Sequence, residues 1–177
     1  FPLATILRPS VVYSVDDNFT TNFMTLLSRL PLFPLYYNGD TKFTPIHCSD
    51  LTDAISHVIS KNIHSKIIEC VGSEVISLKE ILKRLLKLIN KSRILIPLPF
   101  FAANISAKIF QLFPKPLLTV DQLILLKYDN ILSNKYQTNS DIGAPSIKTF
   151  DQEVEKYSYM WREGGQFSTK KYDHTNS

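Results

Sequence analysis

The sequence predicts an α/β fold, and three observations support this class. Residues 4–13 and 66–71 are short apolar segments of the kind that form buried strands in a parallel sheet. About six further segments carry apolar residues at helical spacing. Because so few strands cannot complete a large sheet, we expect the C-terminal part of a doubly wound fold, with a few strands and a mainly helical lobe.

The segment 4–13 is expected to run as a strand into a loop. Polar residues 16–18 then offer N-cap candidates for a helix over 19–30, whose apolar residues recur at helical spacing. Pro31 and Pro34 follow and are expected to end this helix, because proline lacks the backbone donor that a helix needs.

A turn signal and a polar cap organise the next elements. Asn38-Gly39-Asp40 predicts a turn, and a strand is expected over 42–47. Asp50 is the expected N-cap of the helix that follows, which has one apolar stripe over 51–59. A helix with a single apolar stripe packs that face on a core.

The strand at 66–71 ends at Gly72, and the clearest helix of the chain follows it. Ser77-Leu78-Lys79-Glu80 matches a capping box, in which the serine hydroxyl and the glutamate satisfy free backbone donors. Apolar residues then continue at helical spacing to Ile89. This helix is also basic along residues 78–91.

The last third of the chain predicts helices separated by prolines. Residues 93–99 are a short apolar piece interrupted by prolines, and 100–113 has a helical pattern. A second capping box at 119–122 begins another helix. A last helix is expected over 149–162, before a polar and disordered tail.

Composition and charge limit the classes of function. Hydrophobic residues make up 44% and charged residues 20% of the chain, as in folded proteins. The net charge of +4 indicates solubility or a weak attraction to an anionic surface. The basic helix at 78–91 is more often a solvated face than a lipid-binding one. Since no surface aromatics accompany it, we expect no nucleic-acid partner.

The two cysteines and the absence of targeting signals point to a reducing compartment. Cys48 and Cys70 have neither CxxC nor metal-site spacing and are expected to be free thiols. The sequence opens with no signal peptide and holds no run of about 18 apolar residues that would span a membrane. We therefore expect a cytoplasmic location and no metal ligands.

Motifs that carry known chemistry are missing from the sequence. A dinucleotide fingerprint needs closely spaced glycines at a strand-to-helix turn, and neither this nor a P-loop occurs. None of the eight tyrosines has a lysine four residues later, the spacing at which an ammonium lowers the phenol pKa for proton transfer. We therefore expect no catalytic residue and no catalytic activity from this chain alone.

The end of the first strand is the candidate binding site. Ligands of doubly wound folds sit outside the carboxyl ends of the strands, where Pro9 and Ser10 are expected. Pro9 also removes a backbone donor there. The residue types allow two interpretations equally, a nucleotide pocket or a plain strand terminator.

Four stretches of the sequence form a recognisable combination. They are Leu7–Tyr13, Thr44–Leu51, Glu69–Glu74 with Leu78–Ile81, and Thr119–Leu123 with Leu126–Asn130. Together they resemble the C-terminal half of the atypical short-chain dehydrogenase/reductase family. The last stretch narrows the resemblance to the short-chain-dehydrogenase-like accessory subunits of respiratory complex I and their bacterial relatives. Val11 or Val12 replaces an asparagine of sugar-modifying relatives, which disfavours a nucleotide-sugar substrate. Ser14 stands where the family has glycine.

The resemblance implies the fold, the cofactor and the partners. It implies a Rossmann-like fold with a sheet remnant over 1–76, a helical lobe over 77–165 and a disordered tail over 166–177. It implies NAD(P)(H), held as a structural cofactor with Pro9, Ser10 and Val11 near its nicotinamide end. The expected partners are complex I subunits or the missing N-terminal half, close to a membrane surface. The location is then peripheral, on the inner face of an energy-transducing membrane.

Two alternatives remain open. The chain is the C-terminal part of an NAD(P)-dependent reductase or epimerase whose catalytic half is missing, or it is a non-functional remnant. The glycine fingerprint and any Tyr/Lys pair belong to the half that the family places upstream, so a reductase or epimerase requires that half.

Overall fold

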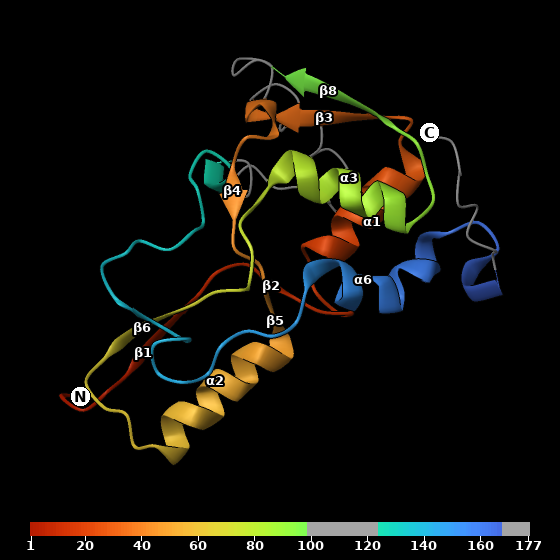
Figure 1. The fold of residues 1–177 in the computed structure, drawn as a ribbon. Helices are drawn as coiled ribbons and strands as arrows, with labels where there is room; N and C mark the ends of the chain where they lie inside the picture. Colours follow the sequence, from red (N-terminus) through yellow and green to blue (C-terminus); the bar gives the residue numbers. More distant parts are fainter. Residues whose placement is uncertain (99–123, 168–177) are drawn as a thin grey trace, which may run out of the picture.

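A computed structural model of the chain describes residues 1–98 and 124–167 (Figure 1). Strands and helices are mixed along the whole of the described chain. The strands are β1 (Ile6–Pro9), β2 (Val12–Tyr13), β3 (Leu32–Tyr36), β4 (Lys42–Phe43), β5 (Ile46–His47), β6 (Ile67–Cys70), β7 (Ile76–Ser77), β8 (Ile94–Leu98) and β9 (Gln137–Thr138). The helices are α1 (Thr20–Arg29), α2 (Cys48–Ser60), α3 (Leu78–Leu88) and α6 (Phe150–Ser158), with 3₁₀ turns η1 (Tyr37–Gly39), η2 (Tyr159–Trp161) and η3 (Gly165–Phe167).

The strands pair in four small groups. The three-stranded sheet has the order β1-β6-β9 and is parallel, with Ile6 opposite Ile67 and Pro9 opposite Cys70. The pairs β2–β5 and β3–β8 are also parallel, and β4–β7 is antiparallel. Parallel pairing of strands that are separated by helices confirms the predicted α/β class.

Two apolar clusters hold these elements together. One lies between the sheet and α2, whose Ala54 and Val58 pack near Ile68 of β6. The larger one gathers residues of α1, α3, α6 and β3, with Leu27 and Leu82 fully buried. Figure 1 shows α2 along β1 and β6, α1 and α3 next to β3 and β8, and α6 next to α3 on the side away from these two strands. The larger cluster contains residues of both predicted domains, 1–76 and 77–165. The division into these domains stays a prediction.

The helices predicted over 19–30, 51–59, 78–89 and 149–162 are observed with changes at their ends. Ser77 caps α3, since its hydroxyl accepts a hydrogen bond from the Glu80 N–H at 3.2 Å, as the capping box predicts. The prediction that Asp50 caps α2 is wrong. The helix begins at Cys48, and the His47 imidazole accepts from the Ser49 N–H. The Asp50 carboxylate is buried instead and accepts from the Lys148 N–H at 3.0 Å.

Prolines mark strands that the sequence pattern did not predict. Pro34 lies inside β3 and Pro97 inside β8, where the pattern predicted only helix ends and breaks. The Ile94 N–H donates to the Pro31 carbonyl and therefore points toward β3. Because the backbone nitrogens of successive residues point to alternate sides of a strand, the nitrogens of Pro34 in β3 and Pro97 in β8 point away from the partner strand. Because only outward donors are lost, both prolines fit this pair.

Gly72, which follows β6, lies very close to the backbone of Pro45. A Cβ built on Gly72 would lie 1.8 Å from the carbonyl oxygen of Pro45. The Gly72 N–H donates to the Thr44 carbonyl at 3.1 Å, which brings the end of β6 against the segment before β5. Only glycine allows this contact.

Some predicted elements cannot be compared. The predicted helix at 100–113, the capping box at 119–122 and residues 168–177 of the predicted tail lie outside the described residues. Within the described part, Cys48 and Cys70 are free thiols, as predicted. None of the described helices combines the length and apolar character that crossing a bilayer requires.

A buried carboxylate fixes α6 against β5. Glu153 accepts a hydrogen bond from Lys156 at 2.6 Å, and it lies 3.8 Å from the Lys148 ammonium and 3.9 Å from the His47 imidazole. Burial alone would raise the pKa of Glu153, but Lys156, His47 and Lys148 outweigh it and lower that pKa. The charged form is therefore favoured in the folded protein.

We predict that Glu153 makes the fold sensitive to acid. Because its pKa is lower in the folded than in the unfolded chain, its contribution is present above pH ~4.3 and is lost as the pH falls through the folded value. Glu153→Gln should lower the free energy of unfolding by about 1 kcal/mol at pH 7 and flatten its decline between pH 5 and 3. Urea unfolding across this pH range measures both effects.

The control is Glu163→Gln, whose side chain is 93% exposed. This variant should follow the wild-type pH profile within about 0.5 kcal/mol. An unchanged acid profile for Glu153→Gln would contradict the role of this carboxylate.

Candidate functional site

A cavity of about 250 Å³ opens at the carboxyl ends of β1 and β6. It is the place where doubly wound sheets bind ligands. Its lining includes both polar and charged side chains. The lining residues are Arg8, Pro9, Ser10, Glu69, Val71, Asp129, Asn130 and Ile131.

Pro9 and Ser10 occupy different positions in this cavity. Pro9 is exposed, and it lies at a position of β1 whose nitrogen faces away from β6, since Ser10 is the residue that donates to the Cys70 carbonyl. Ser10 is buried, and its hydroxyl donates to the carbonyl of Asn130 at 3.1 Å. Ser10 therefore fixes the end of β1 to Cys70 and to Asn130. The exposed Pro9 lines the cavity.

The backbone of Asn130 forms the wall opposite β1. Its carbonyl accepts from the Thr44 N–H at 3.1 Å and the Thr44 hydroxyl at 3.2 Å, in addition to Ser10. The Asn130 N–H donates to the Lys42 carbonyl at 2.8 Å, and the Asp129 carboxylate accepts from the Lys42 N–H at 2.8 Å. These bonds hold a segment from late in the sequence against β4 and the end of β1.

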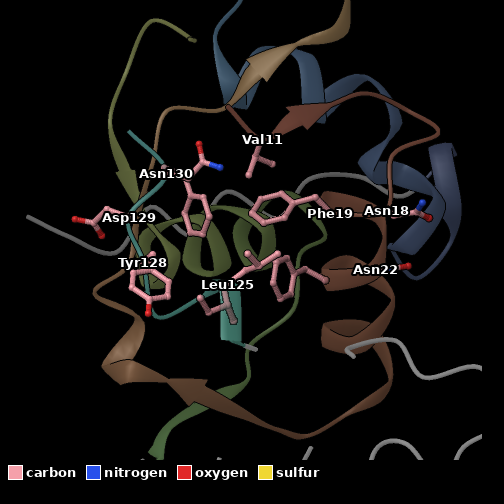
Figure 2. A pocket seen from close by; sticks show the side chains of 11 residues that line it. Val11, Asn18, Phe19, Asn22, Leu125, Tyr128, Asp129 and Asn130 are labelled. Carbon is pink, nitrogen blue, oxygen red and sulfur yellow. The ribbon is translucent and has the colours of Figure 1, made fainter. Parts of the chain in front are cut away.

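A second cavity, of about 290 Å³, shares Asp129 and Asn130 with the first, and Figure 2 shows its lining side chains. It has an apolar interior with polar side chains at its margin. Its lining residues are Val11, Asn18, Phe19, Asn22, Phe23, Phe43, Leu125, Leu126, Tyr128, Asp129 and Asn130. Because Asp129 and Asn130 line both cavities, the two cavities are neighbours.

Three phenylalanine rings form the apolar interior. The Phe19 ring lies 5.2 Å from that of Phe23 at 84°, and 5.5 Å from that of Phe43 at 57°. Edge-to-face and tilted arrangements are the preferred contacts of aromatic rings. Phe23 and Phe43 are buried, whereas Phe19 is half-buried and faces the cavity, as Figure 2 shows.

Asp17 determines where Phe19 lies. The N-cap residue of α1 is Phe19, whose side chain cannot accept a hydrogen bond. Asp17, two residues earlier, accepts from the free backbone N–H groups instead. Its carboxylate accepts from the N–H groups of Phe19 and Thr21, both at 3.0 Å, and from the Thr20 hydroxyl at 2.7 Å. One carboxylate therefore fixes both the start of α1 and the backbone of Phe19.

The charged groups of the first cavity are already engaged. The buried Glu69 carboxylate accepts from the Ser133 N–H at 3.0 Å, and the Arg8 guanidinium lies 5.5 Å from the centre of the Tyr136 ring. In the described part of the chain, no three His, Cys, Asp or Glu side chains converge to hold a metal ion. The first cavity thus offers fixed hydrogen-bonding groups.

The structure places the predicted site residues at both cavities. Pro9 and Ser10 line the first, and Val11 lines the second. That these three residues contact a cofactor stays a prediction. Asp129 and Asn130 were not predicted as site residues, although they lie in the most specific of the four recognised stretches.

Comparison with known proteins supports the predicted resemblance. No family model matches the chain. It is 25% identical over 175 residues to the mitochondrial NADH dehydrogenase [ubiquinone] 1 alpha subcomplex subunit 9 of Arabidopsis thaliana, which covers 93% of this chain and 43% of that protein. The protein of the same name from Dictyostelium discoideum is 30% identical over 82 residues, covering 46% of this chain and 23% of that protein.

The predicted resemblance to the complex I accessory subunits is therefore confirmed. The matched region spans less than half the length of each of these two relatives.

Solved structures confirm the predicted Rossmann-like fold class. The protein RMD of Pseudomonas aeruginosa, complexed with NADPH, superposes with a TM-score of 0.58 at 8% identity, covering 89% of this chain and 47% of that one. The dTDP-glucose 4,6-dehydratase of Bacillus anthracis, in complex with NAD, gives 0.57 at 15% identity, covering 89% and 43%. The UDP-glucose 4-epimerase of Thermotoga maritima gives 0.54 at 11% identity, covering 87% and 44%. At sequence identities this low, the structural similarity shows only that the folds are alike.

We predict that Asp17 is required for a stable second cavity. Asp17→Ala removes the acceptor for the first free donors of α1 and should lower the free energy of unfolding by about 1–2 kcal/mol. Asp16→Ala is the matched control, because Asp16 is exposed and directly precedes Asp17 in the sequence. The control should stay within about 0.5 kcal/mol of wild type in urea unfolding. Equal losses in both variants would contradict the assignment of the cap.

Proposed function

We propose that this chain is part of an NAD(P)-binding accessory protein of respiratory complex I, in which the dinucleotide serves as a structural cofactor. The similarity to the Arabidopsis subunit carries this proposal, because it extends over 93% of the chain. The relatives are named as subunits of a mitochondrial NADH dehydrogenase. Their assembly partners are therefore the partners that we propose here.

The first cavity is the proposed contact with the nicotinamide end of the cofactor. It lies at the carboxyl ends of β1 and β6, and the exposed Pro9 faces it. The backbone around Ser10 is fixed by hydrogen bonds to Cys70 and Asn130, so this wall is formed before a ligand arrives. A preformed wall loses little conformational entropy on binding. Val11 continues the same strand end toward the second cavity.

A structural role for the cofactor fits the proton-transfer groups of this chain. No tyrosine in the sequence has a lysine at the spacing of a reductase pair. Tyr13 is buried, and burial raises its pKa well above the usual value, with Glu153 and Asp50 adding to the effect. A phenol of this kind does not release a proton at neutral pH. No observation in the described residues favours a reductase or an epimerase over the accessory role.

We propose that the helical lobe contacts partner subunits through the basic face of α3, on the inner face of the respiratory membrane. Lys79, Lys83 and Lys87 recur at four-residue spacing and are all exposed. They form one stripe along the helix. Arg84 is not part of it, because this guanidinium pairs with Glu74 at 3.0 Å and Glu80 at 3.3 Å.

The assembly role predicts that the protein migrates with complex I. After mild detergent extraction of respiratory membranes, an antibody against this chain should detect it in the native-gel band that carries NADH dehydrogenase activity. Replacing the three stripe lysines by glutamate should reduce this fraction several-fold, because an anionic partner would then be repelled. The control is the same exchange at Lys61 and Lys66, which are exposed outside α3. Migration only at the mass of the free protein would contradict the proposal.

The cofactor role predicts a ligand-dependent melting temperature. For the protein that carries this chain, NADPH or NADH at 100 times its Kd should stabilise the fold by about 2.7 kcal/mol, which raises Tm by roughly 5–10 °C. Pro9→Trp should abolish this rise, because the indole would fill the cavity that Pro9 faces. Pro2→Trp, at an exposed site outside the cavity, should leave the rise unchanged. No rise at millimolar NADH and NADPH would refute cofactor binding.

A further inference from the structure

We propose that the second cavity is a separate binding site for an uncharged, mainly apolar small molecule with one hydrogen-bonding end. This goes beyond the proposed cofactor role, because Pro9 and Ser10 line the first cavity and are not among the described residues that line the second. Its volume of about 290 Å³ is near the lower end of the range of small-molecule sites.

The interior of the cavity favours an apolar ligand. The Phe19 ring packs against the rings of Phe23 and Phe43, at 5.2 and 5.5 Å between ring centres, and Phe19 keeps part of its surface uncovered. A ligand that covers this ring gains the free energy of burying apolar surface, about 25 cal/mol per Å². Val11 and Leu126 add further apolar wall.

The mouth of the cavity also exposes apolar surface. Leu125 is 67% exposed and Tyr128 is 62% exposed, although both line the cavity. Figure 2 shows these two side chains beside the interior rings. Both belong to a turn in which the Lys127 N–H donates to the Ile124 carbonyl and the Tyr128 N–H to the Leu125 carbonyl. Large exposed apolar side chains at a cavity mouth mark a binding surface.

Charge decides against an anionic ligand. Among the lining residues that the structure describes, Asp129 is the one that carries a full charge at neutral pH, and no lysine or arginine accompanies it. A phosphate or diphosphate in this cavity would be desolvated beside a carboxylate, with no cation among these residues to compensate. Asn18 and Asn22 offer neutral amides at the margin, which suit one polar end of an otherwise apolar molecule.

Both walls are fixed before a ligand binds. Asp17 holds the backbone of Phe19 on one side, and the Asn130 hydrogen bonds to Lys42 and Thr44 hold the other. The buried Thr41 hydroxyl donates to the Leu126 carbonyl and anchors the turn below the mouth. The cavity is therefore preorganised, and binding need not order its backbone.

The test uses phenylnaphthylamine, an uncharged aromatic dye whose fluorescence rises in apolar sites, titrated into the full chain. We expect saturable binding of one dye per chain. Leu125→Asp should weaken binding at least about tenfold, because it places a carboxylate at the mouth. Ile124→Asp is the matched control, since Ile124 is the exposed neighbour and is not among the described lining residues. The control should bind within about twofold of wild type.

Both substitutions are at exposed positions, and equal Tm values will show that folding is unaffected. A second variant, Asn22→Leu, extends the apolar lining and should keep or tighten dye binding. Non-saturable binding, equal losses at Leu125 and Ile124, or displacement of the dye by uridine diphosphate glucose would each overturn the proposal. The dye titration contains no dinucleotide, and the NADPH titration does not depend on Leu125, so failure of one proposal is distinguishable from failure of the other.

Discussion

Both cavities depend on the hydrogen bonds that the backbone carbonyl of Asn130 accepts. It accepts two hydrogen bonds from Thr44 and one from Ser10, and thereby joins β1, the segment after β4 and a part of the chain 120 residues away from Ser10. These bonds support both the end of β1 and the segment that follows the turn over 124–128. Asp129 adds to this support by accepting from the Lys42 N–H. On the Asn130 side the groups that bond are main-chain atoms, so their positions do not depend on the rotamer of Asn130.

The prolines of the strands obey one geometric rule. Pro9, Pro34 and Pro97 lie at positions whose nitrogens face away from the paired strand. A proline at an inward position would remove a ladder hydrogen bond, whereas an outward proline removes none. In the described chain, β1, β3 and β8 all lie at sheet edges, which is where such positions occur. Pro9 combines this role with an exposed place at the first cavity.

The sequence predicted what local patterns determine. Apolar spacing and a capping serine predicted α3, and an apolar run predicted β1 and β6. The pairing of β3 with β8 was not predicted, because prolines inside strands carry the same sequence signal as prolines that end helices. Two-residue strands such as β9 are too short to show a period. In the site, Pro9 and Ser10 followed from their place at a strand end. Asp129 and Asn130 reach them only through long-range backbone bonds that no local pattern encodes.

The fold alone does not decide what this chain binds. Its structural neighbours include a dehydratase and an epimerase at 11–15% identity, so one architecture accommodates more than one chemistry. The residues around the cavities discriminate where the fold does not. Three phenylalanines and a lone carboxylate disfavour a charged sugar nucleotide in the second cavity, and Val11 stands beside them. The first cavity keeps fixed polar groups at the strand ends, as a dinucleotide requires. Under the proposed cofactor role, polar groups at the first cavity and an apolar second cavity suit an accessory protein better than a sugar-modifying enzyme.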